Sequence, residues 1–253
     1  MDPRRRRGLP AGAQRGGTRG RRAARLPDLV AAPGIKLNWD AIEGLSDTLG
    51  RNGVTSNYRY EMASYTWELV QNLNGGKALF TQPTMPIKCA GAPQKAMYLA
   101  CDEWRRRGVL DGVDVEFNNA GAVLFGVKEF VPPLMKYVEK YGIDLNFNSN
   151  LIAVDGPAHK AWFRVTSDDG EEVVEKSFDM LHVCPPQTAP DFVRSSPLAN
   201  EAGWVEVDAE TLQHVRYGNV FGLGRRLLRP QRQDSGRGAQ AGAGGRRKRH
   251  RYT

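Results

Sequence analysis

Residues 77–107 read KALFTQPTMPIKCAGAPQKAMYLACDEWRRR, and three structural signals follow one another in them. Lys77 to Thr81 is a short apolar run that predicts a buried strand. Gln94 to Arg107 has helical spacing, with Pro93 near the first helical position. The connection between these two elements contains Cys89. We therefore expect a thiol just ahead of a helix N-terminus.

Cys89 is flanked by Lys88 and Lys95 within this glycine-containing turn. Free backbone N–H groups at a helix start and nearby ammonium groups favour a thiolate over a thiol. This pattern predicts a redox-active cysteine. The alternative is a small apolar side chain that fills a turn, which is the usual role of a lone cysteine.

The residues after this helix alternate between strand and helix patterns. Val113 to Phe117 and Ile143 to Phe147 are predicted strands, and Lys128 to Tyr141 between them is a predicted helix. This order predicts a βαβ unit and an α/β fold.

A group of shorter strands follows. Residues 151–154, 161–165 and 172–176 predict an antiparallel meander, with a hairpin turn at 167–170. Met180 to Val183 predicts a return to a buried strand.

Composition excludes several classes of protein. The 253 residues contain three cysteines and four histidines without metal-ligand spacing, so neither a disulfide scaffold nor a metal site is predicted. No apolar run is long enough to span a bilayer, and no signal-peptide pattern is present. We expect this chain by itself to be soluble and cytoplasmic.

The net charge of +8 is concentrated at the two ends of the chain. Residues 1–25 carry +8 and residues 225–253 carry +9, which leaves −9 for the residues between them. Such segments, rich in arginine and glycine, are predicted to be disordered. They can bind RNA or DNA, and a nucleic-acid-binding protein is therefore one alternative function. The acidic central body argues against it, so no nucleic-acid partner is expected.

Several motifs resemble those of one enzyme family in order and spacing. The segment Lys88 to Lys95, followed by Met97-Tyr98-Leu99, resembles the active-site segment of sulfide:quinone oxidoreductases, particularly the branch with the mitochondrial enzymes. The resemblance covers about residues 29 to 224. Its other motifs are 32–37, 125–128, 180–183 with Pro185 and Pro186, 202–205, 211–214 and 219–224.

This resemblance implies a fold and a division of the chain. The family has two dinucleotide-binding, Rossmann-like domains of the FAD/NAD(P)-binding kind, and this chain is expected to be truncated at both ends. The expected division is 1–28 basic tail, 29–75 end of the FAD domain with a linker at 38–74, 76–182 second Rossmann-like domain with a meander, 183–224 return to the FAD domain, and 225–253 basic tail.

The resemblance also implies a chemistry. In the family, two cysteines form a disulfide or sulfur-bridged pair beside FAD, hydrosulfide attacks one sulfur, and two electrons pass through FAD to quinone. Cys89 matches one cysteine of that pair, and its partner belongs to the region beyond Gly224. Sulfide and quinone are the implied substrates, and the intact family members attach peripherally to a membrane. This chain alone is expected to be inactive.

The residues expected to contact FAD fall in three segments. The segment after the predicted strand 29–31 resembles the exit from the flavin domain, and two spaced glycines near residue 222 suit a close backbone approach to the cofactor. The cofactor-binding candidates are Ala32, Pro33, Gly34, Pro185, Pro186, Gly222 and Gly224.

Arg225 replaces the aspartate that follows this glycine pair in the family. Back-translation of residues 224–253 with GC-rich codons, read one base later, permits a peptide that begins Asp-Ala-Ala-Ser-Ser-Gly and resembles the family's continuation. We therefore expect a frameshift near Gly224 and a similar break before Leu29, which sequencing of the gene can test.

Nicotinamide binding is not expected. The loop 118–126 has glycine only at Gly121 and Gly126 and lacks the Gly-x-Gly-x-x-Gly fingerprint, and Asn146 to Asn148 offers no acidic residue for a ribose. An NAD-dependent disulfide oxidoreductase remains a second alternative, disfavoured by this loop and by the absence of a Cys-x-x-Cys pair.

The remaining cysteines and histidines are interpreted as structural. Cys184 is expected in the core, and Cys101 is expected to be inert because Asp102 and Glu103 follow it. His182 and His214 are expected to be hydrogen-bonded structural residues.

Overall fold

A parallel sheet of five strands organises residues 26–224, which are the residues that the computed structural model describes. The strand order is β3-β10-β4-β5-β6, and every neighbouring pair in it is parallel. The expected basic segments 1–25 and 225–253 lie outside the described residues. The bounds are β3 Val54–Thr55, β10 Met180–His182, β4 Gly76–Gln82, β5 Val113–Asn119 and β6 Asp144–Phe147.

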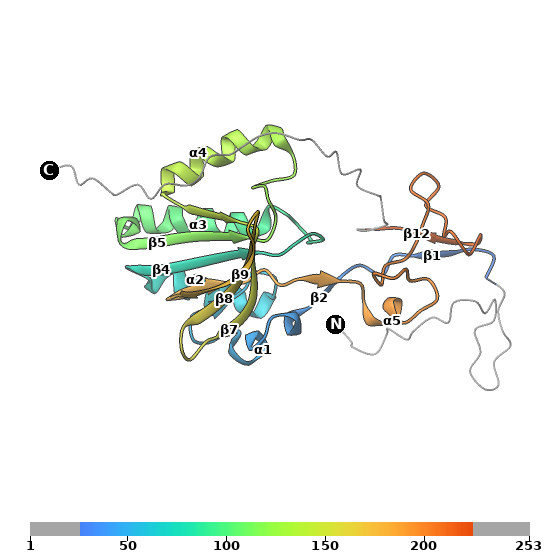
Figure 1. Cartoon of the computed structure of the whole chain (residues 1–253), viewed down its shortest axis with the longest axis horizontal. Helices are drawn as coiled ribbons and strands as arrows, with labels where there is room; N and C mark the ends of the chain where they lie inside the picture. The colour runs from blue at the N-terminus through green and yellow to red at the C-terminus, as the bar shows by residue number, and fades with distance from the viewer. Residues whose placement is uncertain (1–25, 225–253) are drawn as a thin grey trace.

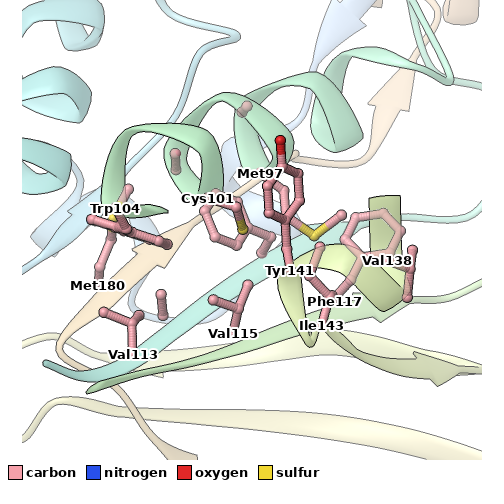
Figure 2. Packing of buried hydrophobic residues seen from close by; sticks show 14 of the residues in the cluster. Met97, Cys101, Trp104, Val113, Val115, Phe117, Val138, Tyr141, Ile143 and Met180 are labelled. Carbon is pink, nitrogen blue, oxygen red and sulfur yellow. The ribbon is translucent and has the colours of Figure 1, made fainter. Parts of the chain in front are cut away.

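Helices α3 (Ala92–Arg106) and α4 (Val131–Tyr141) cover one face of this sheet (Figure 1). Alternate residues of β5 and the i, i+4 spaced residues of α3 point into one core, which Figure 2 shows. Helix α2 (Ala63–Asn72) joins this core, because the buried Trp104 Nε1 donates a hydrogen bond of 2.9 Å to the Val70 carbonyl oxygen.

A three-stranded antiparallel sheet covers the opposite face. Its strands are β7 (Ser149–Asp155), β8 (Lys160–Ser167) and β9 (Gly170–Ser177). Leu151 and Phe163 of this sheet pack against a second core that contains Leu79 of β4. The predicted strand at residue 77, the helix after Cys89, the βαβ unit and the meander are all confirmed. The α/β fold class is therefore confirmed.

A smaller unit is built on two short strands that lie far apart in the sequence (Figure 1). Strand β1 (Leu29–Ala31) pairs in parallel with β12 (Val220–Gly222). The chain crosses between this unit and the large sheet twice. The two crossings contain β2 (Lys36–Leu37) and β11 (Gln187–Thr188), which pair with each other as antiparallel strands. A third core, to which α5 (Asp191–Arg194) contributes Val193, supports this unit.

The segment 38–74, which we expected to be a linker, is largely structured. It contributes β3 at the edge of the five-stranded sheet and helix α2 against α3. Strand β3 was not predicted, because a two-residue strand has no measurable periodicity. The remaining short helices are α1 Leu45–Thr48, η1 Trp39–Ala41, η2 Tyr60–Met62, η3 Leu110–Gly112 and η4 Lys128–Phe130.

Within residues 26–224, no helix has both the length and the apolar character needed to cross a membrane.

Candidate functional site

Cys89 lies in the connection between β4 and α3, at the carboxyl edge of the large sheet. Crevices at this edge are the usual place for ligands in open parallel sheets. Its side chain is half-buried, and its carbonyl oxygen accepts the amide of Ala92, the first residue of α3, at 3.1 Å. The structure therefore places Cys89 just ahead of a helix N-terminus, as predicted.

Two side chains from distant segments hold this turn. The Tyr58 hydroxyl donates to the carbonyl oxygen of Cys89 at 3.1 Å. The amide of Lys88 donates to Gln187 Oε1 at 2.7 Å. The backbone on both sides of the Cys89 peptide is thus fixed by groups that lie 31 and 99 residues away in the sequence.

The lysines of the turn face solvent. Lys88 and Lys95 are both exposed, and no ion pair joins either of them to a carboxylate in the part of the chain that the structure describes. The predicted effect of these two ammonium groups on the thiol stays a prediction.

Cys184 is the second cysteine of this region. It lies two residues after the end of β10, is 2% exposed, and its amide donates to Thr81 Oγ1 at 3.1 Å. Burial raises the pKa of the Cys184 thiol to about 12, and a hydrogen bond with the Tyr58 side chain acts in the opposite direction. The expectation of a buried thiol agrees with the structure. Its proximity to Tyr58 was not predicted, because no local pattern joins residues 58, 89 and 184.

Cys101 is fully buried in the core under α3 (Figure 2). Burial raises the pKa of its thiol to about 12. The expectation that Cys101 is structural agrees with this geometry, but the reason differs. We expected the charges of Asp102 and Glu103 to suppress the thiolate, whereas burial is the main cause.

Both histidines of the matched motifs are buried. His182 Nε2 accepts the amide of Asn57 at 3.1 Å, and burial lowers the pKa of His182 to about 4. His214 Nε2 lies 3.1 Å from the carbonyl oxygen of Leu198, and its Nδ1 accepts the amide of Arg216 at 3.0 Å. These contacts agree with structural roles. Residues 26–224 contain no group of three or more side chains suited to a metal ion.

Two of the three flavin candidate segments meet at one edge of the smaller unit. Because β1 and β12 are parallel, residues 32–34 and 222–224 continue from the same end of the pair. The Leu223 amide donates to the Ala31 carbonyl oxygen at 2.9 Å. Gly224 has a φ of +115°, and a Cβ at this position would meet no atom of residues 26–224 within 4 Å.

The third candidate segment, Pro185 and Pro186, lies between the two units. They join β10 to β11, and the Pro186 carbonyl oxygen accepts the amide of Asn38 at 2.8 Å. The structure therefore places these prolines beside Cys184, on the connection that leads away from the large sheet.

The loop after β5 differs from a dinucleotide-binding turn. Asn119 Oδ1 accepts the amide of Gly121 at 2.9 Å, and Asn119 Nδ2 donates to the Val123 carbonyl oxygen at 2.9 Å. The Gly121 carbonyl oxygen in turn accepts the amide of Asn148 at 3.1 Å. Helix α4 begins only at Val131, so the loop does not lead directly into a helix N-terminus that could hold a pyrophosphate.

Comparison with known proteins identifies relatives for most of the chain, although no protein-family model matches it. The chain is 43% identical over 198 residues to the mitochondrial sulfide:quinone oxidoreductase of Dictyostelium discoideum and 41% identical over 196 residues to that of Mus musculus. Each match covers 78% of this chain and 43% of the relative. The chain therefore spans less than half the length of these curated relatives.

A solved structure agrees in fold. The X-ray structure of the sulfide:quinone oxidoreductase from Aquifex aeolicus matches with a TM-score of 0.63 and 22% identity, over 78% of this chain and 45% of that chain. The resemblance to sulfide:quinone oxidoreductases that the motifs indicate is confirmed.

Proposed function

We propose that this chain, as a relative of the sulfide:quinone oxidoreductases, is part of a flavoprotein that oxidises sulfide with Cys89 as a redox thiol and passes the electrons to quinone. The observation that carries the proposal is the position of Cys89. Among the three cysteines, Cys89 alone is not fully buried, and it lies in the turn that leads into α3. The named relatives match over a stretch that covers most of the chain.

The proposed step is a thiol–disulfide exchange. Hydrosulfide attacks Cys89 Sγ within a disulfide, the bond to the second sulfur breaks, and the electron pair leaves with that second sulfur as a thiolate. Cys89 then carries a persulfide. The two anchors of the turn, Tyr58 and Gln187, keep the Cys89 backbone in place while the side chain reacts.

FAD is the proposed electron acceptor, and it would supply two-electron chemistry when bound. Gly224 and the adjacent segment 32–34 support part of a flavin site. The described residues contain no Gly-x-Gly-x-x-Gly turn that could hold the pyrophosphate, so they do not form a complete site. We therefore assign these residues a supporting role and expect weak or no flavin binding by this chain alone.

The two alternative functions have less support. An NAD-dependent disulfide oxidoreductase needs a pyrophosphate cradle after β5, and the self-bonded loop around Asn119 does not offer one. A nucleic-acid-binding protein would rely on residues 1–25 and 225–253, which lie outside the described residues. Neither relative that carries the proposal is named as a nucleic-acid-binding protein.

The proposal extends to the location of the whole protein. Both relatives are named as mitochondrial enzymes. We propose that the intact protein, like its family, attaches peripherally to a membrane where quinone is available.

A chimera tests this function directly. Residues 29–224 would replace the matched segment of the Dictyostelium enzyme, and sulfide-dependent quinone reduction would be measured. We expect an active yellow protein, and we expect Cys89→Ser to lower its turnover on the order of a hundredfold or more without loss of flavin. Cys101→Ala is the control and should retain activity. A Cys89→Ser chimera with full activity would overturn the proposal.

The chain by itself gives a second test. We expect the purified chain to be colourless and unable to reduce quinone with sulfide. A yellow preparation with bound flavin would contradict this expectation.

A further inference from the structure

The loop that follows β3 is tied to the end of β10. Ser56 Oγ donates to the carbonyl oxygen of Val183 at 2.6 Å, and the amide of Asn57 donates to His182 Nε2 at 3.1 Å. The amide of Tyr58 donates to Ser56 Oγ at 3.2 Å. Ser56 and His182 are both fully buried. The backbone of Tyr58 is therefore fixed, and its ring extends from a rigid base.

The hydroxyl of Tyr58 reaches a group that the sequence keeps far away. It donates to the Cys89 carbonyl oxygen at 3.1 Å, so the phenol joins the loop after β3 to the turn that holds Cys89.

We propose that Tyr58 is a positioning residue for Cys89. Tyr58 holds the carbonyl side of Cys89, whereas Gln187 holds the preceding amide of Lys88. Without the Tyr58 hydroxyl, the Cys89 carbonyl oxygen keeps the amide of Ala92, but the tie to the loop after β3 is lost, and the half-buried Cys89 side chain becomes more accessible. The inference rests on the proposed function only for the claim that this thiol meets sulfide.

The test measures the rate at which iodoacetamide alkylates Cys89 in the folded full-length chain, by mass spectrometry of the labelled peptide. We expect Tyr58→Phe to raise this rate about fivefold, the effect of one lost hydrogen bond. Tyr60→Phe is the matched control, because Tyr60 is 91% exposed and should leave the rate unchanged. Labelling of the fully buried Cys101 reports global opening and should not rise.

Tyr58→Leu gives a second arm. It removes the same hydroxyl together with the ring, and it should also raise the rate of Cys89 alkylation. If Tyr58→Phe fails to fold, this variant carries the test.

Equal alkylation rates for Tyr58→Phe and the wild type, at equal thermal stability, would overturn the proposal. The measurement needs neither sulfide nor flavin, so its failure is distinguishable from failure of the proposed function.

Discussion

Two loops leave neighbouring parallel strands at the same edge of the large sheet, and they are held in opposite ways. The loop after β4 contains Cys89 and is fixed from outside, by Tyr58 and Gln187. The loop after β5 is fixed mainly from within, by the side chain of Asn119. External anchors leave the groups of the first loop available at a defined position. Hydrogen bonds within the second loop occupy its polar groups, as expected for a connection with a structural role.

The largest effects are expected when the buried phenylalanine in the strand before each loop is truncated. Phe80 and Phe117 are register partners on β4 and β5, and both are fully buried. We expect Phe80→Ala and Phe117→Ala each to lower the free energy of unfolding by about 3–5 kcal/mol in urea titrations. Only Phe80→Ala should also speed alkylation of Cys89 under native conditions. Equal acceleration by both variants would remove the distinction between the two loops.

Low pH should lower the free energy of unfolding through the buried His182. Its pKa is about 4 in the folded chain against 6.5 for an ordinary histidine, so the unfolded state binds the proton first as the pH falls. Stability should be unaffected by this group above pH 6.5 and should decline toward pH 4, by about 3 kcal/mol in all. Urea titrations of the wild type and of His182→Gln across this range measure the contribution. An identical pH dependence in the variant would contradict this assignment.

A smaller effect is expected in the loop after β5. Asn119→Ala removes the two hydrogen bonds that close this loop and should cost about 1–3 kcal/mol of stability. Alkylation of Cys89 should not change, because the anchors of the first loop are intact. Accelerated labelling in this variant would show that the two loops are coupled.

The smallest expected effect concerns the second anchor of the Cys89 turn. Gln187→Leu leaves the amide of Lys88 without its acceptor and should cost about 1 kcal/mol, with a faster alkylation of Cys89. Gln213→Leu, in the smaller unit, is the control, because Gln213 bonds to the carbonyl oxygen of Gly218 instead. Equal labelling rates in the two variants would show that Gln187 does not hold the turn.

The elements around Cys89 were predictable because their signals are local. An apolar run before the turn and helical spacing after Pro93 are enough to place β4 and α3. The motifs that indicate the family are local in the same sense. The α/β class and the βαβ order follow from them.

The support of the site was not predictable. Tyr58 and Gln187 reach the turn from segments far apart in the sequence, and hydrogen bonds across such separations leave no periodic pattern. Strand β3 was missed for a related reason, since its two residues take their role from the neighbouring β10. The sequence patterns therefore predicted the position of Cys89 ahead of α3 but not the residues that hold its turn.

The central claim is that Cys89 is the sulfur-reactive cysteine of this chain. The direct measurement exposes the folded chain to inorganic polysulfide and determines by mass spectrometry which cysteine gains sulfur. The thiolate of a reactive cysteine cleaves a sulfur–sulfur bond of the polysulfide, and the shortened polysulfide leaves with the electron pair. The account predicts a persulfide on Cys89 and none on Cys101 or Cys184. An unmodified Cys89, or equal modification of all three cysteines, would contradict it.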